Sequence, residues 1–406
     1  MADAPEIRTK TILSSKRELC LYIVAGEPSG DALGAKLMER LNQEARGRIR
    51  YLGVGGELMQ KQGLVSQFPL SDVAVMGPLS ILPRLPKIIR RVYRTVDAAI
   101  SAEPDALIII DSPEFTHPIA KRVRRKRPDI PIIDYVSPSV WAWRPGRAKK
   151  MRRYVDHVLA LLPFEPEVHA RLGGPPCTYV GHPLIEQKPW IDTLDTAPLA
   201  SRLKIKPDQP VLVVLPGSRR SEVSKLIQPF GDAVTALHAR GVMPVVLVPV
   251  VDSVRDIVEA SIATWPGRVH LIDGDHDKFR AFKLAKAALA ASGTVTLELA
   301  LAGTPMVVAY KLDAVANRFR FLLRAHSIVL ANLVLGRNAF PELLQHDVNG
   351  ETLAEVIEPL LSDTDWRAGQ LAALAEIPRR MLLTKGTPSG AAASIVLAMA
   401  EAGAKR

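Results

Sequence analysis

Asp111 is the first residue after a fully apolar run, ALIII at residues 106–110. Such a run predicts a buried strand, and the residue after a parallel strand lies where ligands bind in open α/β sheets. A carboxylate there can accept a proton from a substrate hydroxyl, so Asp111 is a candidate general base. The Ser-Pro pair that follows permits a second interpretation, in which Asp111 caps a helix with proline in its first turn. His117 is a weaker candidate base, because a lone histidine beside a proline is more often structural.

A strand-to-helix turn in the second half, LPGSRRSE at residues 215–222, has the composition of a phosphate site. Backbone N–H groups of Gly217, Ser218 and Arg219 at a helix N-terminus could hold a diphosphate, and the guanidinium of Arg219 matches phosphate oxygens. The alternative is an ordinary turn in which Ser218 is the helix N-cap.

A second turn of this kind, ASGT at residues 291–294, offers the backbone and hydroxyl donors of Ser292, Gly293 and Thr294. Glu298 follows on an apolar stretch, VTLELALA, where a carboxylate is costly to bury unless strong donors bind it. The two hydroxyls of a ribose are such donors, although Glu298 could also be a partly exposed helix residue. Together the two turns predict a nucleotide-diphosphate pocket, and no cluster with ligand spacing predicts a metal in it.

The first glycine-rich turn, VAGEPSGDALG at residues 24–34, differs from both. Its glycines are four residues apart, which does not match the G-x-G-x-x-G dinucleotide pattern. Glu27 and Asp31 would repel a pyrophosphate. We therefore expect this turn to border something other than a nucleotide phosphate.

The formal net charge of +11 is concentrated in three clusters of the first half, at residues 87–94, 121–127 and 144–153. This asymmetry favours an anionic partner. Aromatic residues are only 5% of the chain and do not alternate with the basic residues, which argues against nucleic acid. Trp141 and Trp143 are expected to share one face of an extended segment. Core packing is the default role, but Arg144 and Arg147 beside them could dock an anionic sugar phosphate.

A further segment, residues 75–94, combines apolar side chains with cations and has prolines at positions 78, 83 and 86 that interrupt a regular helix. This combination suits an anionic bilayer surface or an acyl chain. Residues 86–94 could equally be an ordinary crossover helix. The candidate acceptor- or membrane-contacting residues are Met76, Leu79, Ile81, Leu82, Arg84, Trp143 and Arg144.

The elements that must position these residues alternate between apolar runs and amphipathic stretches, such as 31–45 and 84–102. We predict strands at 20–25, 50–54, 106–110, 131–136 and 157–161, then at 211–215, 244–250, 269–272, 287–290 and 305–310. This alternation predicts an α/β fold of two doubly wound, Rossmann-like domains facing a central cleft, with one substrate on each. A small-residue-rich apolar helix at 388–402 must pack against another element.

Two cysteines, a polar N-terminus and the lack of a long apolar window predict a cytoplasmic protein, or one bound at most to a membrane surface.

Several motifs, in order from about residue 20 to 350, resemble the lipid-A-disaccharide synthase family: VAGEPSGDALGA, DSPEF, YVSPSVWAWR, LLPFE, YVGHPL, LPGSR, ASGT, TPMVVAYK and ELLQ. The resemblance implies an inverting glycosyltransferase of the GT-B type that needs no cofactor. It implies transfer from UDP-2,3-diacylglucosamine to 2,3-diacylglucosamine 1-phosphate (lipid X), on the cytoplasmic leaflet of the inner membrane. The alternatives are another GT-B enzyme acting on UDP-N-acetylglucosamine, as a 2-epimerase or soluble-acceptor transferase, and a basic module that binds nucleic acid.

The resemblance also implies roles for particular residues. Asp111 matches the general base and Glu27 the first-turn glutamate, a second candidate for that role. The resemblance places the nucleotide on the other domain, so the acidic residues of the first turn, Glu27 and Asp31, are expected to orient a sugar hydroxyl. Arg219 and Glu298 match donor-binding positions, as do Asn332 and Gln345. The sequence departs from the family at Ala331, where proline is common.

The domain organisation that follows is an N-terminal tail (1–19), an acceptor domain (20–186), a UDP-sugar domain (187–375) and C-terminal helices (376–406). The resemblance implies that these helices pack back on the acceptor domain and could be exchanged between two copies, giving a homodimer.

Overall fold

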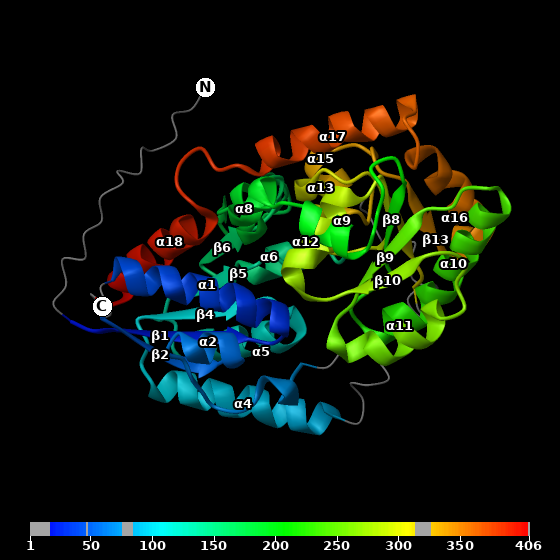
Figure 1. The fold of residues 1–406 in the computed structure, drawn as a ribbon. Helices are drawn as coiled ribbons and strands as arrows, with labels where there is room; N and C mark the ends of the chain where they lie inside the picture. The colour runs from blue at the N-terminus through cyan, green and yellow to red at the C-terminus, as the bar shows by residue number, and fades with distance from the viewer. Residues whose placement is uncertain (1–16, 46–47, 75–83, 313–325, 405–406) are drawn as a thin grey trace. The chain divides into compact units, whose positions relative to one another are not determined.

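The computed structural model describes residues 17–45, 48–74, 84–312 and 326–404. These residues form two compact units (Figure 1). The first comprises the described residues up to Pro183 together with those from Leu383 onward, and the second runs from Leu184 to Leu382.

The first unit is built on a seven-stranded parallel sheet in the order β3-β2-β1-β4-β5-β6-β7. All residues of the central strands β1 and β4 are buried, as expected for a parallel sheet covered on both faces. The strands are β1 Leu19–Ala25, β2 Ile49–Val54, β3 Val65–Ser66, β4 Ala106–Ile110, β5 Ile132–Tyr135, β6 His157–Ala160 and β7 Cys177–Tyr179.

Helices cover both faces of this sheet. Figure 1 shows α1 and α18 on one side and α4 on the other, in agreement with the two hydrophobic clusters of this unit. The small residues of α18, such as Ala392 and Ala400, are fully buried against α1 and β1. The helices are α1 Pro28–Glu44, α2 Glu57–Lys61, α4 Leu85–Ser101, α5 Pro113–Lys126, α6 Gly146–Met151, α7 Glu165–Arg171 and α18 Pro388–Ala404.

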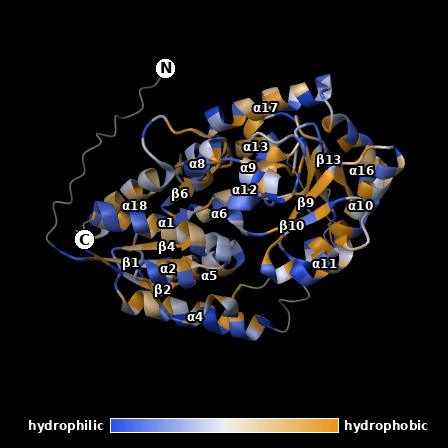
Figure 2. Ribbon diagram, in the orientation of Figure 1, coloured by the Kyte–Doolittle hydropathy of each residue, from blue (hydrophilic) through white to orange (hydrophobic). Residues whose placement is uncertain are grey.

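The second unit has a six-stranded parallel sheet in the order β10-β9-β8-β11-β12-β13, which repeats the topology of the first. Figure 2 shows the hydrophobic residues concentrated on the strands and the inward faces of the helices. The strands are β8 Val211–Leu215, β9 Val245–Pro249, β10 Val269–Ile272, β11 Ala287–Ala291, β12 Met306–Tyr310 and β13 Glu342–Leu344.

Helices α10 and α16 pack together in the second unit, and α13 contacts α8, α12, α15 and α17. The helices are α8 Lys188–Thr193, α9 Ala197–Arg202, α10 Arg220–Ala239, α11 Arg255–Ile262, α12 Gly274–Leu284, α13 Val295–Ala302, α15 Leu330–Leu335, α16 Gly350–Ile357 and α17 Asp365–Met381. Short 3-10 turns are Leu70–Asp72, Pro183–Gln187, Asp252–Val254, Gln345–Asp347 and Glu358–Leu360.

The ten predicted strands are all present, with ends within one or two residues of those expected, and the doubly wound α/β class is confirmed. The strands that the apolar pattern did not predict are β3, β7 and β13. Each lies at an edge of its sheet and has only two or three residues, too few to show a pattern. Helix α17 crosses the expected boundary at residue 375 and packs on α13 and α15.

Among the described residues, the helices are each too short or too polar to cross a bilayer. Met76, Leu79, Ile81 and Leu82, which we expected to contact the acceptor or the membrane, lie outside the described residues.

Candidate active site

Asp111 and Ser112, directly after β4, both have left-handed backbone conformations, with φ of +52° and +44°. Such values are costly for residues other than glycine and persist only where surrounding bonds impose them. Here the Asp111 N–H donates to the Tyr135 carbonyl at 3.1 Å, and the Thr116 hydroxyl donates to the Asp111 carbonyl at 2.7 Å. The sheet and the first turn of α5 together therefore fix the direction in which the Asp111 side chain leaves the backbone.

Asp111 lies at the switch point between β1 and β4, where the strand order of the sheet reverses direction. The Ser29 hydroxyl, from the first turn of α1, donates to Asp111 Oδ2 at 3.1 Å. The helix-cap alternative for Asp111 is wrong, because the N-cap of α5 is Ser112, which makes no side-chain capping bond. Glu27 is the N-cap residue of α1 in the same turn and is half-buried. The candidate base and the first-turn glutamate thus flank the same switch point.

Asp31 does not orient a sugar hydroxyl, contrary to our expectation. Its carboxylate is buried and accepts three backbone N–H groups, from Gly56, Leu58 and Met59, at 2.8–3.1 Å. The side chain therefore supports the N-terminus of α2, where a negative charge is favourable. Glu27, the other acidic residue of this turn, stays a candidate for contact with a ligand.

The tryptophan segment is a turn, so the expected extended conformation is wrong. The N–H groups of Ala142 and Trp143 both donate to the Ser139 carbonyl. Trp141 packs edge-on against Phe164, whereas Trp143 lies under the Arg144 guanidinium, 5.2 Å from the ring centroid. The two indoles therefore have different roles, the first in a small core and the second beside a cation.

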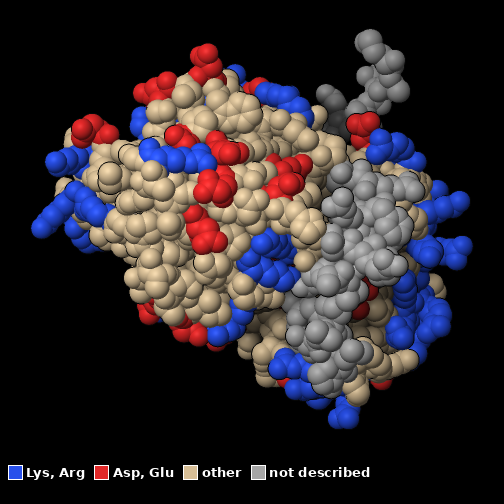
Figure 3. Space-filling model, turned by 90° about the vertical axis from the view of Figure 1, so that its right-hand side faces the viewer, with Lys and Arg blue, Asp and Glu red and all other residues tan. Residues whose placement is uncertain are grey.

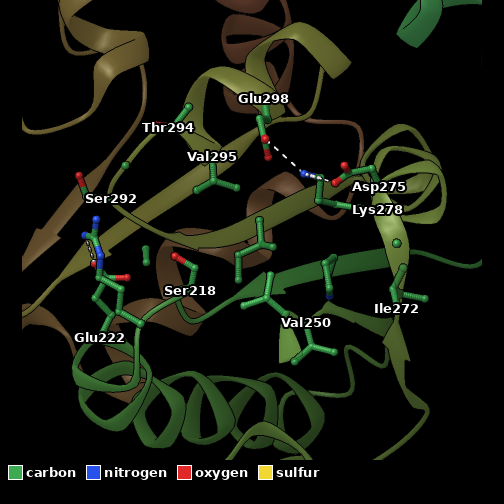
Figure 4. A pocket seen from close by; sticks show the side chains of 18 residues that line it. Ser218, Glu222, Val250, Ile272, Asp275, Lys278, Ser292, Thr294, Val295 and Glu298 are labelled. Atoms are coloured by element: carbon green, nitrogen blue, oxygen red, sulfur yellow. Dashed lines mark hydrogen bonds and ion pairs between the residues drawn. The ribbon is translucent and has the colours of Figure 1, made fainter. Parts of the chain in front are cut away.

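A cavity of about 450 Å³ lies at the carboxyl edge of the second sheet, beyond the ends of β8, β9, β10 and β11. Figure 4 shows Ser218 and Glu222 on one side of it and Lys278 and Asp275 on the other. The structure brings together seven of the predicted donor residues in its lining: Gly217, Ser218, Arg219, Ser292, Gly293, Thr294 and Glu298.

The first turn of this cavity exposes backbone. Gly217 has a φ of +124°, and a Cβ at this position would lie 2.7 Å from Cβ of Glu222. The N-cap of α10 is Arg219, so the alternative with Ser218 as the cap is wrong. Arg219 Nη1 donates to Glu222 Oε1 at 2.9 Å, and the arginine side chain is 51% exposed. Glu222 is only 16% exposed, so a ligand can reach this pair from the arginine side.

Glu298 lies in the first turn of α13 and is only 19% exposed. Lys278 Nζ donates to Glu298 Oε1 at 3.2 Å and lies 3.0 Å from Asp275 Oδ1 (Figure 4). Burial lowers the pKa of Lys278, but the two carboxylates outweigh burial and raise the pKa above its ordinary value. Lys278 was not among the residues predicted from the sequence. The signal was its place near the start of α12, the helix that follows β10 at the same sheet edge as the predicted turns.

Asn332 and Gln345 are not brought into the cavity. Asn332 is fully buried, and its amide binds the backbone of Ala339 and Phe340 and the hydroxyl of Ser327. Gln345 Oε1 accepts the Leu312 N–H at 3.1 Å. In this arrangement both side chains hold loops together rather than presenting a group to a nucleotide.

The cavity lining offers the groups that bind a nucleoside diphosphate. These are backbone N–H groups at two turns, the guanidinium of Arg219 and a carboxylate, Glu298, that can accept hydroxyl groups. Within the described ranges, His, Cys, Asp and Glu residues do not gather in threes at a possible metal site. The first unit differs, because its switch point presents a fixed carboxylate and its surface is basic. The three basic runs of the sequence, at 87–94, 121–127 and 144–153, all belong to this unit. Over one face of the whole molecule, Figure 3 shows Lys and Arg gathered along one edge, with few acidic side chains among them.

Two solved structures with the same fold were compared with the chain. The UDP co-structure of MnaA from S. aureus has a TM-score of 0.60 and 13% identity, and covers 94% of this chain and 95% of that chain. The calicheamicin glycosyltransferase CalG4 has a TM-score of 0.55 and 15% identity, and covers 94% of this chain and 98% of that chain. The two Rossmann-like units and these likenesses show that the chain has the GT-B fold.

The sequence comparisons are more specific. A family model described as Lipid-A-disaccharide synthetase matches residues 21–378. A lipid-A-disaccharide synthase from Rhodopseudomonas palustris (strain HaA2) is 50% identical over 378 residues, covering 93% of this chain and 95% of the relative. Another from Nitrobacter hamburgensis is 49% identical over 386 residues, covering 95% of this chain and 96% of the relative. The chain belongs to the lipid-A-disaccharide synthase family and is an enzyme of lipid A biosynthesis, which confirms the resemblance seen in its motifs.

Proposed function

We propose that this enzyme transfers 2,3-diacylglucosamine from UDP to the 6-hydroxyl of 2,3-diacylglucosamine 1-phosphate, with inversion at the anomeric carbon. The observation that carries the proposal is the division of chemistry between the two switch points. One presents a fixed carboxylate, and the other presents phosphate-binding turns. The family to which the chain belongs supplies the identity of the two sugars.

In the proposed reaction, Asp111 accepts the proton of the acceptor hydroxyl while that oxygen attacks the anomeric carbon of the donor. The bond between the anomeric carbon and the UDP oxygen breaks in the same step, and UDP leaves with the electron pair. A positioned base of this kind contributes about a hundred- to ten-thousand-fold in rate. Ser29 holds Asp111 Oδ2, so the other carboxylate oxygen is the one that we assign to the substrate. Glu27 is the second candidate for this role.

On the donor side, we assign the diphosphate to the turn at Gly217, Ser218 and Arg219. When the diphosphate binds, Arg219 exchanges Glu222 for a phosphate oxygen. A preorganised donor at developing charge is worth about 3–4 kcal/mol of transition-state stabilisation. We assign the ribose hydroxyls to Glu298, with Lys278 fixing the orientation of its carboxylate.

Helix α4 supports an association with the membrane surface. Leu85, Ile89 and Tyr93 recur at helical spacing on its outer side and are 42%, 47% and 51% exposed. Arg90 and Arg94 are exposed on the same helix, and Figure 2 shows hydrophobic and hydrophilic residues close together along it. Apolar anchors beside cations favour the anionic inner leaflet, where acylated substrates reside. Exchange of the C-terminal helices between two copies remains a prediction, since α18 here packs on α1 of its own chain.

The experiment that tests the proposal incubates the purified protein with UDP-2,3-diacylglucosamine and lipid X in the presence of EDTA. We expect release of UDP together with a disaccharide phosphate of inverted anomeric configuration. Turnover of UDP-N-acetylglucosamine without any lipid would instead identify an epimerase. Absence of product with UDP still bound would contradict the assigned acceptor, and absence of UDP binding would contradict the assignment of the second-unit cavity.

A further inference from the structure

A second cavity, of about 490 Å³, lies in the first unit between one face of α5 and one face of α6. The α5 residues repeat at helical spacing, as do those of α6, so each helix presents a continuous side to the cavity. Its lining is Pro113, Glu114, His117, Pro118, Lys121, Arg144, Gly146, Arg147, Lys150 and Tyr154. Two of the three basic runs in the sequence, 121–127 and 144–153, thus converge here instead of forming separate solvated helix faces.

The cavity carries an excess of positive charge. Lys121, Arg144, Arg147 and Lys150 line it, and the single carboxylate among the lining residues is that of Glu114, which pairs with Arg147. Within the part of the chain that the structure describes, no ion pair neutralises the other three cations. Burial lowers the pKa of the Lys121 ammonium, and the nearby Arg147 lowers it further. The cations therefore repel one another, and a bound anion would relieve that repulsion.

The inner wall of the cavity is rigid. Tyr154 and His117 are both buried, with the phenol oxygen 2.9 Å from His117 Nδ1. On its other side, His117 Nε2 lies 3.3 Å from Oδ2 of the fully buried Asp134. The Tyr154 ring lies under Lys121, whose ammonium is 5.0 Å from the ring centroid. These contacts hold the Tyr154 ring, and the ring in turn restrains the Lys121 ammonium. Less side-chain entropy is therefore lost when an anion binds to Lys121.

The cavity also adjoins the proposed acceptor site. Helix α5 begins two residues after Asp111, and its first residues, Pro113 and Glu114, line the cavity. On the other wall, Arg144 has a left-handed φ of +51° and stacks on Trp143. A ligand held between α5 and α6 therefore lies beside the first turn of α5, which follows the candidate base in the chain. The guanidinium groups of Arg144 and Arg147 match phosphate oxygens, and the lysines add compact positive charge.

We infer that this basic cavity binds the phosphomonoester of the acceptor sugar. The inference rests on the proposed function, in which the acceptor carries an anomeric phosphate. A phosphomonoester is a near-dianion at neutral pH and fits a site where four cations face one carboxylate. The donor needs no such site, because its diphosphate has the turns of the second unit. The cavity thus selects a phosphorylated acceptor over a neutral sugar.

The test compares two acceptors, 2,3-diacylglucosamine 1-phosphate and the same lipid without the phosphate. The variants are Lys121→Gln, Lys150→Gln and the double variant. Lys149→Gln is the matched control, since Lys149 is an exposed neighbour of Lys150 on α6 outside the lining. We expect each lining variant to raise KM for the phosphorylated acceptor about tenfold or more, the usual effect of removing one charged partner. KM for the neutral acceptor and for the donor should not change, and Lys149→Gln should behave as wild type.

Equal loss with both acceptors would overturn the inference, because a merely structural role of the lysines affects both alike. A second arm measures binding to vesicles of phosphatidylglycerol and of phosphatidylcholine. Loss of binding to the anionic vesicles, with KM for the phosphorylated acceptor unchanged, would assign the cavity to a lipid headgroup and overturn the inference as well. Wild-type turnover separates the two levels of the proposal. If the wild type makes no disaccharide, the proposed function has failed, whereas turnover without phosphate selectivity contradicts only this inference.

Discussion

The carboxyl edges of the two sheets have the same topology but opposite backbone chemistry. In the first unit, the residues with left-handed φ after β4 and β5 are Asp111, Ser112 and Val136, none of them glycine. In the second unit, the positive-φ residues in the turns after β8 and β11, the counterparts of β1 and β4, are glycines, Gly217 and Gly293. Glycine adopts such conformations freely and leaves its N–H groups open to a ligand. An aspartate or a valine must be forced into them, at about 1–3 kcal/mol each.

The difference shows how one fold can serve two tasks. At the first edge, strain is maintained by hydrogen bonds to the Asp111 backbone, and the result is a side chain with a fixed direction. At the second edge, the absence of side chains lets the backbone approach a phosphate. We therefore expect substitutions at the first edge to change the chemical step and substitutions at the second to change nucleotide affinity.

The largest effect is expected for Asp111→Asn. Asparagine tolerates the left-handed conformation and can still accept the Ser29 hydroxyl, but it cannot take a proton. We expect kcat to fall by about a hundred- to ten-thousand-fold, with the Kd of UDP unchanged. Steady-state kinetics and calorimetric UDP titration measure the two quantities. A comparable loss of UDP affinity would remove Asp111 from the base role, and a larger loss of kcat in Glu27→Gln would transfer that role to Glu27.

Gly217→Ala should weaken UDP binding, in contrast to Asp111→Asn, which should lower kcat. The new Cβ would lie 2.7 Å from Cβ of Glu222 at a φ of +124°, so the turn must shift. A cost of about 1–2 kcal/mol raises the Kd of UDP about tenfold. The matched control is Gly241→Ala, just after the other end of α10. There φ is +80°, and a Cβ added at Gly241 would have no atom within 4 Å apart from those of its chain neighbours. If both variants bind UDP equally well, the backbone of this turn does not contact the diphosphate.

A third prediction concerns Glu165, a buried carboxylate of the first unit. Burial raises its pKa to about 7, although it accepts N–H groups from Leu162 and Trp141. The protonated form is therefore favoured in the folded state, so its stabilising contribution is present below the unfolded pKa and is lost as pH rises through about 7. Between pH 5 and 8, wild type should lose about 2–3 kcal/mol from this group, and Glu165→Gln should not. Chemical denaturation at the two pH values measures the difference.

Glu167→Gln is the control for this measurement, because Glu167 is exposed on the same helix. An unchanged pH dependence in Glu165→Gln would show that Glu165 stays charged in the fold.

The smallest effect is expected for Ile89→Glu on α4. A charge at this exposed apolar position should weaken binding to anionic vesicles about three- to tenfold while leaving UDP affinity unchanged. Trp366→Glu is the matched control in the second unit, since Trp366 is 52% exposed, similar to the 47% of Ile89. Vesicle sedimentation measures both. Equal losses in the two variants would mean that α4 has no special role at the membrane.

The sequence by itself determined the architecture and located seven of the residues that line the second-unit cavity. Long buried strands show as apolar runs, and a parallel sheet places the residues that follow them at one edge, so Asp111, the turn at Gly217 and the turn at Ser292 could be located from pattern alone. The family motifs added the identity of the enzyme, because such motifs are local in the sequence.

Only the tertiary structure decided the partners of the polar side chains. The carboxylate of Asp31 supports α2, the amide of Asn332 holds its own loop, and Lys278 reaches Glu298 across 20 positions of sequence. The basic cavity forms because α5 and α6 bring together two separate basic runs. Hydrogen bonds and ion pairs depend on distances of about 3 Å between groups far apart in the chain. The periodicity of residue types along the sequence does not determine those distances.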